Sequence, residues 1–208
     1  MTNASNTRTD DTRILSRTSL KPFKGFEAIL EYSYQISSSD YSAYQNKFYM
    51  HQGLAESIKP STSTTPYTVT KYSTKYTTLN AFATYNATIK DKHNLSLLAG
   101  FNQEYNNFRY LTVTAYNMIS NELPSISGSD GSTPSTTNDS YSKYALRSGF
   151  FRANYNFMQR YFIEFNGRHD LSSKFPKNSR SGFFPSVSGA WSIGNEKFME
   201  STKDWLSI

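Results

Sequence analysis

Residues 160–191 read RYFIEFNGRHDLSSKFPKNSRSGFFPSVSGAW, and this stretch decides the fold. It holds two runs of alternating apolar and polar residues, joined by a polar segment at 172–181. A period of two predicts β-strands in which one side is apolar and the other side is wet. The apolar side of the first run consists of Tyr161, Ile163, Phe165 and Gly167, and that of the second run of Phe183, Pro185, Val187, Gly189, Trp191 and Ile193.

The same alternation recurs along most of the chain. Residues 1–11 are polar and are expected to form a loop or a trailing strand, and the tail at 194–208 has room for one helical turn. Between them the pattern predicts about seven strands of an all-β, antiparallel sheet. The expected strands are 13–20, 26–35, 72–89, 95–114, 141–157, 161–170 and 183–193.

The composition fits such strands better than a helical core. The 208 residues include 16 Tyr and 15 Phe, yet the mean hydropathy is −0.63, so aromatic residues are interleaved with polar ones. The absence of Cys excludes a disulfide framework and thiolate metal sites. The net charge of +6 comes from scattered Lys and Arg residues, which argues against nucleic-acid binding. The N-terminus lacks the apolar segment of a signal peptide, so any targeting segment is expected outside these residues.

The connections between the expected strands alternate in length. Those at 21–25, 90–93 and 158–160 are short, the polar stretches 37–70 and 115–140 are long, and 172–181 is intermediate. One rim of the sheet should therefore carry tight turns and the other rim loops. Outer-membrane β-barrels have this asymmetry, whereas a Greek-key sandwich has no reason for it. The aromatic residues beside the turn at 158–160 suit either a membrane interface or ordinary cross-strand pairs.

Candidate chemical groups are few. His51, His93 and His169 are too far apart in the sequence to suggest a metal site, and turn or barrel-interior positions explain them better. Glu164 and Asp170 resemble a glycosidase carboxylate pair, but a solvated charge ladder on one side of a strand accounts for them more simply. No nucleotide-binding or hydrolase motif occurs. The best candidates for a polar lining are Arg152, Asn154, Glu164, Asn166, Arg168 and Asp170.

The quoted stretch also resembles a conserved segment of SusC/RagA-type TonB-dependent outer-membrane transporters. That family shows Arg-x-Asp-Gly-Ser-Ser-x-Phe followed by Gly-aromatic-Phe-Pro-Ser-hydrophobic-Ser and Trp, and this chain departs from it at Leu171 and in the small residues before Trp191. The stretches at 21–34, 93–104 and 195–206 are similar to the family as well. The residues that match the motif are Arg168, Asp170, Ser172, Ser173, Phe175, Gly182, Phe184, Pro185, Ser186, Ser188 and Trp191.

The resemblance implies that residues 1–208 are part of the β-barrel domain of a larger transporter of about 22 strands, with the plug domain and the signal peptide outside them. It implies no enzymatic activity and no cofactor. The implied partners are a SusD-like surface lipoprotein, TonB acting through the plug, outer-membrane lipid, and a large nutrient such as an oligosaccharide or a peptide. The implied location is the outer membrane of a Gram-negative bacterium of the Bacteroidetes type.

Two alternatives remain on the sequence alone. A soluble or surface-attached β-sheet module could bind carbohydrate through its aromatic side chains. An outer-membrane barrel enzyme would need a catalytic constellation that this stretch lacks.

Overall fold

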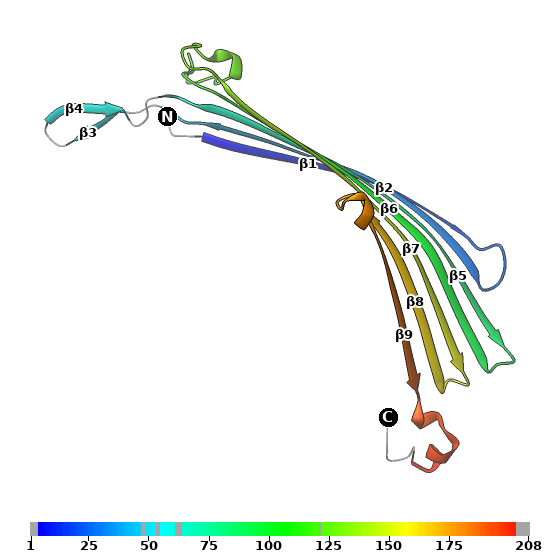
Figure 1. The fold of residues 1–208 in the computed structure, drawn as a ribbon. Helices are drawn as coiled ribbons and strands as arrows, with labels where there is room; N and C mark the ends of the chain where they lie inside the picture. Colours follow the sequence, from blue (N-terminus) through cyan, green and yellow to red (C-terminus); the bar gives the residue numbers. More distant parts are fainter. Residues whose placement is uncertain (1–3, 47–48, 53–54, 61–63, 121, 203–208) are drawn as a thin grey trace. The chain divides into compact units, whose positions relative to one another are not determined.

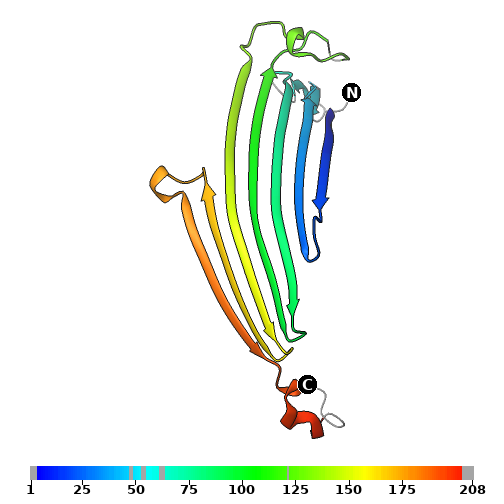
Figure 2. The ribbon, with the colours of Figure 1, turned by 90° about the vertical axis from the view of Figure 1, so that its right-hand side faces the viewer.

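The computed structural model describes residues 4–46, 49–52, 55–60, 64–120 and 122–202. Its main feature is an antiparallel sheet in which seven strands lie in the order β1-β2-β5-β6-β7-β8-β9 (Figure 1, Figure 2). The strands of this sheet are β1 Ala4–Leu20, β2 Phe26–Tyr44, β5 Tyr67–Ile89, β6 His93–Ala115, β7 Thr136–Phe157, β8 Tyr161–Ser172 and β9 Ser181–Trp191. The all-β antiparallel fold predicted from the alternation is therefore confirmed.

Smaller elements lie in the connections. The strands β3 Tyr49–Gln52 and β4 Ala55–Pro60 pair with each other as a separate antiparallel sheet. Short 3-10 helices are η1 Ile126–Gly128, η2 Lys177–Ser179, η3 Ile193–Asn195 and η4 Lys197–Thr202. No helix in the described part of the chain is long and apolar enough to span a membrane.

Several strands are longer than their apolar residues suggested. The polar start of the chain belongs to β1 from Ala4 onward, β2 runs on to Tyr44, and β7 begins at Thr136. The expected loops at 37–70 and 115–140 are correspondingly shorter, and the first contains the β3-β4 pair. Strand pairing uses backbone groups, so Ser- and Thr-rich segments can continue a ladder without an apolar side.

The short turns at 90–92 and 158–160 have the same backbone form. Both central residues have positive φ in each turn: 53° at Lys90 and Asp91, and 54° and 55° at Met158 and Gln159. Two successive residues with positive φ form the type I′ turn, whose twist matches that of the strands it joins. In the second turn, the Asn156 side chain accepts a hydrogen bond from the Gln159 backbone N–H at 2.8 Å.

The chain divides into two compact units, each built from lengths of the same strands. The first comprises residues 1–13, 35–75 and 106–143, and the second comprises residues 14–34, 76–105 and 144–208. The first unit holds a small core of Tyr44, Ala115 and Met118, with Tyr67 and Ile126 packed against it. The second has no large fully buried side chain among the described residues. Many of its apolar side chains lie along one side of the strands, although Phe150, Phe162 and Phe184 lie on the other.

Candidate functional site

The pairing of β7, β8 and β9 sorts polar and apolar residues onto opposite sides of the second unit. Ala153, Phe165 and Val187 stand opposite one another in neighbouring strands. One position further along β8, Asn166 stands opposite Arg152 on β7 and Ser186 on β9. Because successive residues of a strand point to opposite sides, the charged and amide side chains gather on one side, which also carries Phe150, Phe162 and Phe184. The two sides predicted from residues 160–191 therefore exist as continuous surfaces.

Three of the predicted lining residues form one hydrogen-bonded group. The Arg152 guanidinium donates from Nε to Asn166 Oδ1 at 2.7 Å, and Asn166 Nδ2 donates to Glu164 Oε1 at 2.6 Å. The same guanidinium lies 3.8 Å from Glu164 Oε2. Asn154 stands opposite Glu164 in the β7-β8 pairing, which extends the group across the strands. The positive charge of Arg152 is thus balanced by the negative charge of Glu164 on the same side of the sheet.

A second group lies further along β8. Arg168 Nε donates to Asp170 Oδ1 at 2.6 Å, and its terminal nitrogen donates to Ser148 Oγ at 3.1 Å. Ser148 is only 4% exposed although its side chain is polar, so the hydrogen bond from Arg168 satisfies a buried hydroxyl. The six predicted lining residues therefore fall on one side of the sheet and form two separate groups.

The polar side continues onto the strands before β7. Asn102 donates to Asn80 at 2.6 Å, and Asn80 donates to Glu31 at 3.3 Å. On the neighbouring part of the same strands, the Tyr76 hydroxyl donates to Glu104 Oε2 at 2.5 Å. The sequence alone does not pair these residues, because the pairing depends on the register between strands. The result is a broad surface of linked amides, carboxylates and guanidinium groups.

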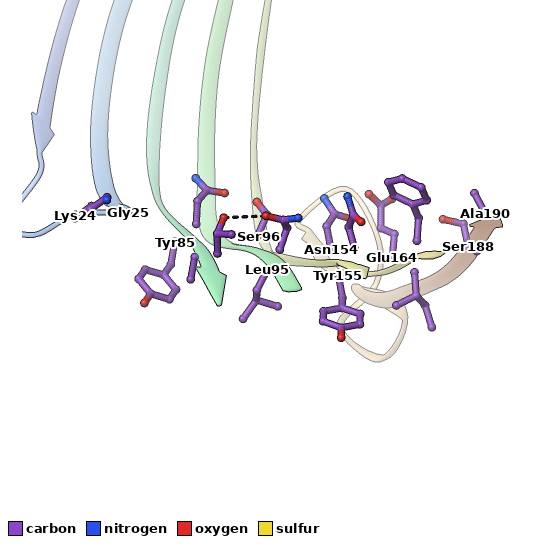
Figure 3. A pocket seen from close by; sticks show the side chains of 18 residues that line it. Lys24, Gly25, Tyr85, Leu95, Ser96, Asn154, Tyr155, Glu164, Ser188 and Ala190 are labelled. Carbon is purple, nitrogen blue, oxygen red and sulfur yellow. Dashed lines mark hydrogen bonds between the residues drawn. The ribbon is translucent and has the colours of Figure 1, made fainter. Parts of the chain in front are cut away.

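A hollow lies across this surface near the short turns. Figure 3 shows Ser96, Asn154 and Glu164 on one side of the strands, whereas Tyr85 and Tyr155 point the opposite way. The hydroxyl of Thr88 donates to Asn94 at 2.8 Å within the lining. Hydroxyl and amide groups dominate the polar side of the hollow, so it can form many hydrogen bonds but offers no activated nucleophile.

The motif residues around the 172–181 turn have structural contacts. Ser173 closes the end of the β7-β8 pair, since its Oγ accepts from the Ala145 N–H at 2.8 Å. Arg180 donates from Nε to the Phe175 carbonyl at 2.9 Å, and its own carbonyl accepts from the Ser172 N–H at 2.9 Å. On β9, Gly182, Phe184, Pro185, Ser186, Ser188 and Trp191 stand opposite Asp170, Arg168, Gly167, Asn166, Glu164 and Tyr161.

The histidines do not meet one another in the described residues. His93 lies at the 90–92 turn as expected, where its Nδ1 is 2.6 Å from the Tyr155 hydroxyl and its ring is 4.9 Å from that of Phe157. His169 was expected at a turn or in the barrel interior, but it stands opposite Gly149 and Phe183 on the apolar side. The side chain of His51 lies outside the described residues. No group of three His, Asp or Glu side chains suited to a metal ion occurs in the described chain.

Glu196 is the centre of a cluster that sequence analysis missed. Its Oε1 accepts from the Tyr161 hydroxyl at 2.7 Å and from Trp191 Nε1 at 3.1 Å. A terminal guanidinium nitrogen of Arg160 lies 3.3 Å from Glu196 Oε2, and Glu196 is only 9% exposed. The hydrogen bonds from Tyr161 and Trp191 hold the pKa of the Glu196 carboxyl below its usual value. The cluster joins the start of β8 and the end of β9 to the segment that follows.

An aromatic cluster in the first unit was also missed. The Tyr72 ring lies 6.3 Å from the Phe108 ring and 5.1 Å from the Tyr110 ring. Tyr72 is two residues from Thr70 in β5, and Tyr110 is two residues from Thr112 in β6. Their rings therefore lie on the same side as this hydrogen-bonded pair of threonines, which is the polar side of β5 and β6. Its sequence signal was the run of alternate aromatics in these strands, but their contact again depends on the register.

No protein-family model matches the chain. It is 31% identical over 120 residues to TonB-dependent receptor P39 of Formosa agariphila, which covers 58% of this chain and 12% of that protein. It is 44% identical over 55 residues to TonB-dependent receptor SusC of Bacteroides thetaiotaomicron, covering 26% of this chain and 6% of that one. The chain thus spans a small part of the length of these relatives.

The fold agrees with these sequence matches. A solved structure of the RagAB peptide importer in its closed-closed state superposes with a TM-score of 0.83 at 24% identity, over 95% of this chain and 21% of that one. At this identity the likeness concerns the fold, and the sequence matches concern the family. By sequence this chain is similar to TonB-dependent receptors, SusC among them, and by fold it matches a segment of the RagAB peptide importer.

Proposed function

We propose that this chain forms part of the wall of an outer-membrane transporter that imports a large nutrient, either an oligosaccharide or a peptide. In this proposal the apolar side of the sheet faces lipid and the polar side lines the lumen. The lining residues are Arg152, Asn154, Glu164, Asn166, Arg168 and Asp170. They bind and guide substrate by hydrogen bonds and charge, without covalent chemistry.

The observation that carries the proposal is the separation of the two sides across neighbouring strands. Phe165, with Ala153 and Val187 opposite it, leaves an aromatic ring 43% exposed on one side. On the other side, Arg152, Asn166 and Glu164 satisfy one another. A sheet with exposed apolar side chains on one face and satisfied polar groups on the other suits a wall between lipid and water. The strands are long enough, since β5 and β6 have 23 residues each and about 9–11 suffice to cross a bilayer.

The aromatic cluster of Tyr72, Phe108 and Tyr110 provides a candidate surface for substrate. It lies on the polar side of strands whose ends lead into the long connections. Flat aromatic rings with polar tips contact sugar rings and peptide side chains well, because they offer a large apolar area at little conformational cost. We infer that the substrate contacts this cluster through its sugar rings or its side chains.

The proposed partners follow from the family. A SusD-like surface lipoprotein captures substrate over the loops, and TonB supplies energy through a plug domain. The support is the similarity to TonB-dependent receptors, among them SusC, and to the fold of the RagAB peptide importer. Outer-membrane lipid contacts the apolar side.

Spin labels at two adjacent positions test the side assignment. Phe165→Cys and Asn166→Cys are labelled in the complete protein that the reading frame encodes, reconstituted in lipid vesicles. The expected result is that the label at 165 is relaxed more by oxygen, which concentrates in lipid, and the label at 166 more by a water-soluble nickel chelate. Ile163→Cys and Glu164→Cys form a second matched pair with the same expectation.

Equal access of the nickel chelate to both members of each pair would contradict a lipid-facing side. So would a protein that stays folded and monomeric in buffer without detergent or lipid. Either result would favour the alternative of a soluble β-sheet carbohydrate-binding module, which titration with oligosaccharides would then test.

A further inference from the structure

A second hollow lies in the first unit, apart from the polar side described above. It is lined by Ser73 and Lys75 of β5, Asn107 and Arg109 of β6, and Tyr141 of β7. The hollow encloses about 540 Å³, which is within the usual range for sites that bind small ligands. Three neighbouring strands therefore contribute polar groups to one place.

This hollow opens on the side opposite to the aromatic cluster. Alternation along β5 puts Lys75 on the other side of the strand from Tyr72, and alternation along β6 separates Arg109 from Phe108 in the same way. The positions of β5 that share the side of Lys75 include Leu79, four residues further along the strand. The hollow thus belongs to the side that the proposed function turns toward lipid.

The hollow is positively charged. Arg109 and Lys143 flank the Tyr141 ring, with Arg109 Cζ at 5.8 Å and Lys143 Nζ at 5.9 Å from its centroid. In the described part of the chain, Lys75, Arg109 and Lys143 form no ion pair with an acidic side chain. The acidic residue next to them on this side of β7 is Asp139, which is exposed. Two cations flank the Tyr141 ring and a third, Lys75, lines the same hollow, which leaves a net positive site for an anion.

Asn107 adds a polar atom that lacks a partner. Its Oδ1 is buried and accepts no hydrogen bond. A buried acceptor without a donor costs free energy, and such a group calls for a missing partner. An anion alone cannot supply one, because phosphate and carboxylate oxygens are acceptors. The missing group must be a donor, such as a hydroxyl.

We propose that this hollow binds the phosphorylated sugar headgroup of a glycolipid in the outer leaflet of the membrane. The phosphate lies between Lys75 and Arg109, a sugar hydroxyl donates to Asn107 Oδ1, and the sugar ring packs on Tyr141, which is 52% exposed. This inference rests on the proposed function only for the side that faces lipid.

The place of the hollow favours a lipid-borne ligand over a free one. Lys75 comes four residues before Leu79 in the sequence of β5. Leu79 begins the apolar positions of β5, which continue through Ala81, Ala83 and Tyr85 toward the short turn. Cations just beyond an apolar band lie at the level of lipid headgroups, where each Lys or Arg strengthens attachment to anionic lipid.

The test uses the complete protein in detergent and the diphosphorylated glucosamine lipid known as lipid A. Binding is measured by native mass spectrometry against three other probes: the same lipid without phosphates, phosphatidylglycerol, and free glucosamine 1-phosphate. Only lipid A carries phosphate, sugar hydroxyls and acyl chains together. It is expected to bind more tightly than each of the other three.

Variants locate the site. K75A/R109A should weaken lipid A binding about thirtyfold, since each removed cation contributes about a factor of five. The control K24A/K92A removes the same charge at the short turns and should leave binding unchanged. N107L removes the orphan acceptor. It should keep or raise the melting temperature without lipid, and it should reduce the rise in melting temperature that lipid A produces.

The outcomes are distinct. Equal loss of binding in K75A/R109A and K24A/K92A, or equal binding of phosphatidylglycerol and lipid A, would overturn the site because charge alone would explain the result. Free glucosamine 1-phosphate that binds as tightly as lipid A would overturn the lipid source and assign a soluble ligand. Loss of lipid A selectivity with a normal result in the spin-label experiment would overturn this inference and leave the proposed function standing.

Discussion

The ring of Phe151 lies over its cross-strand partner Gly167, at the place where a β-carbon on Gly167 would stand. Gly167 is the only buried position of β8. A ring that covers a glycine in the neighbouring strand restores the contact area that the missing side chain would have given. The glycine is therefore required for close approach and not for an unusual backbone angle.

This contact predicts that Gly167→Ala destabilises the complete protein by about 1–3 kcal/mol, because the added methyl group displaces the Phe151 ring. Urea unfolding in detergent micelles measures the change. Gly149→Ala is the matched control, since a β-carbon there meets no atom within 4 Å. Equal costs for the two substitutions would show that the Phe151 contact is not responsible.

The two sides of β8 should respond differently to charge. Phe165→Arg is expected to cost about 2–4 kcal/mol if its side chain meets the centre of the bilayer. Asn166→Arg, on the polar side next to Glu164, should cost much less. Folding of both variants into lipid vesicles, followed by denaturant titration, gives the comparison. Similar costs would refute the assignment of the sides.

Glu196 predicts a dependence of stability on pH. Its pKa in the folded protein lies below the ordinary value of 4.5, chiefly because the Tyr161 hydroxyl donates to it. The stabilising contribution is therefore fully present above the unfolded pKa, and it is lost as the pH falls through the lower folded pKa. Thermal unfolding of the wild type and of Glu196→Gln between pH 7 and pH 3 should show a gap that closes in acid. A gap independent of pH would contradict this account.

The aromatic cluster predicts an effect on substrate. Tyr72→Ala and Tyr110→Ala should each weaken binding of the transported oligosaccharide or peptide about tenfold, because each removes a large contact area with the ligand. Tyr85→Ala, on the opposite side of β5 and itself 37% exposed, serves as the control and should leave binding unchanged. Calorimetry with the complete protein distinguishes the two cases, and a loss confined to Tyr85→Ala would reverse the proposed orientation of the sheet.

Alternation in the sequence was sufficient for the direction of side chains, because it depends only on the local geometry of an extended chain. It placed Phe165 and Asn166 on opposite sides correctly. The expectation that His169 lies at a turn or in the barrel interior came from its polar side chain and is wrong, because alternation from Phe165 and the observed pairing both put it on the apolar side.

The ends of strands and the contacts between strands are harder to predict from the sequence. The polar side chains at the Ser-rich end of β2 predict a loop, whereas backbone pairing determines where a strand stops. The Glu196 cluster and the orphan oxygen of Asn107 could not be found, because each depends on which residues of neighbouring strands stand opposite one another. Such information is absent from a pattern with a period of two.

The Glu196 cluster has a consequence for assembly. If β9 slipped along β8 by one residue, every apolar side chain of β9 would move to the opposite side of the sheet, and this arrangement would be much less stable. A slip by two residues keeps apolar residues opposite apolar ones, so the hydrophobic pattern cannot detect it. Such a slip would separate Trp191 from Tyr161, and the two could no longer donate to the same carboxylate. Glu196 thus favours one of two alignments of the last described strand that the alternation of apolar and polar residues cannot distinguish.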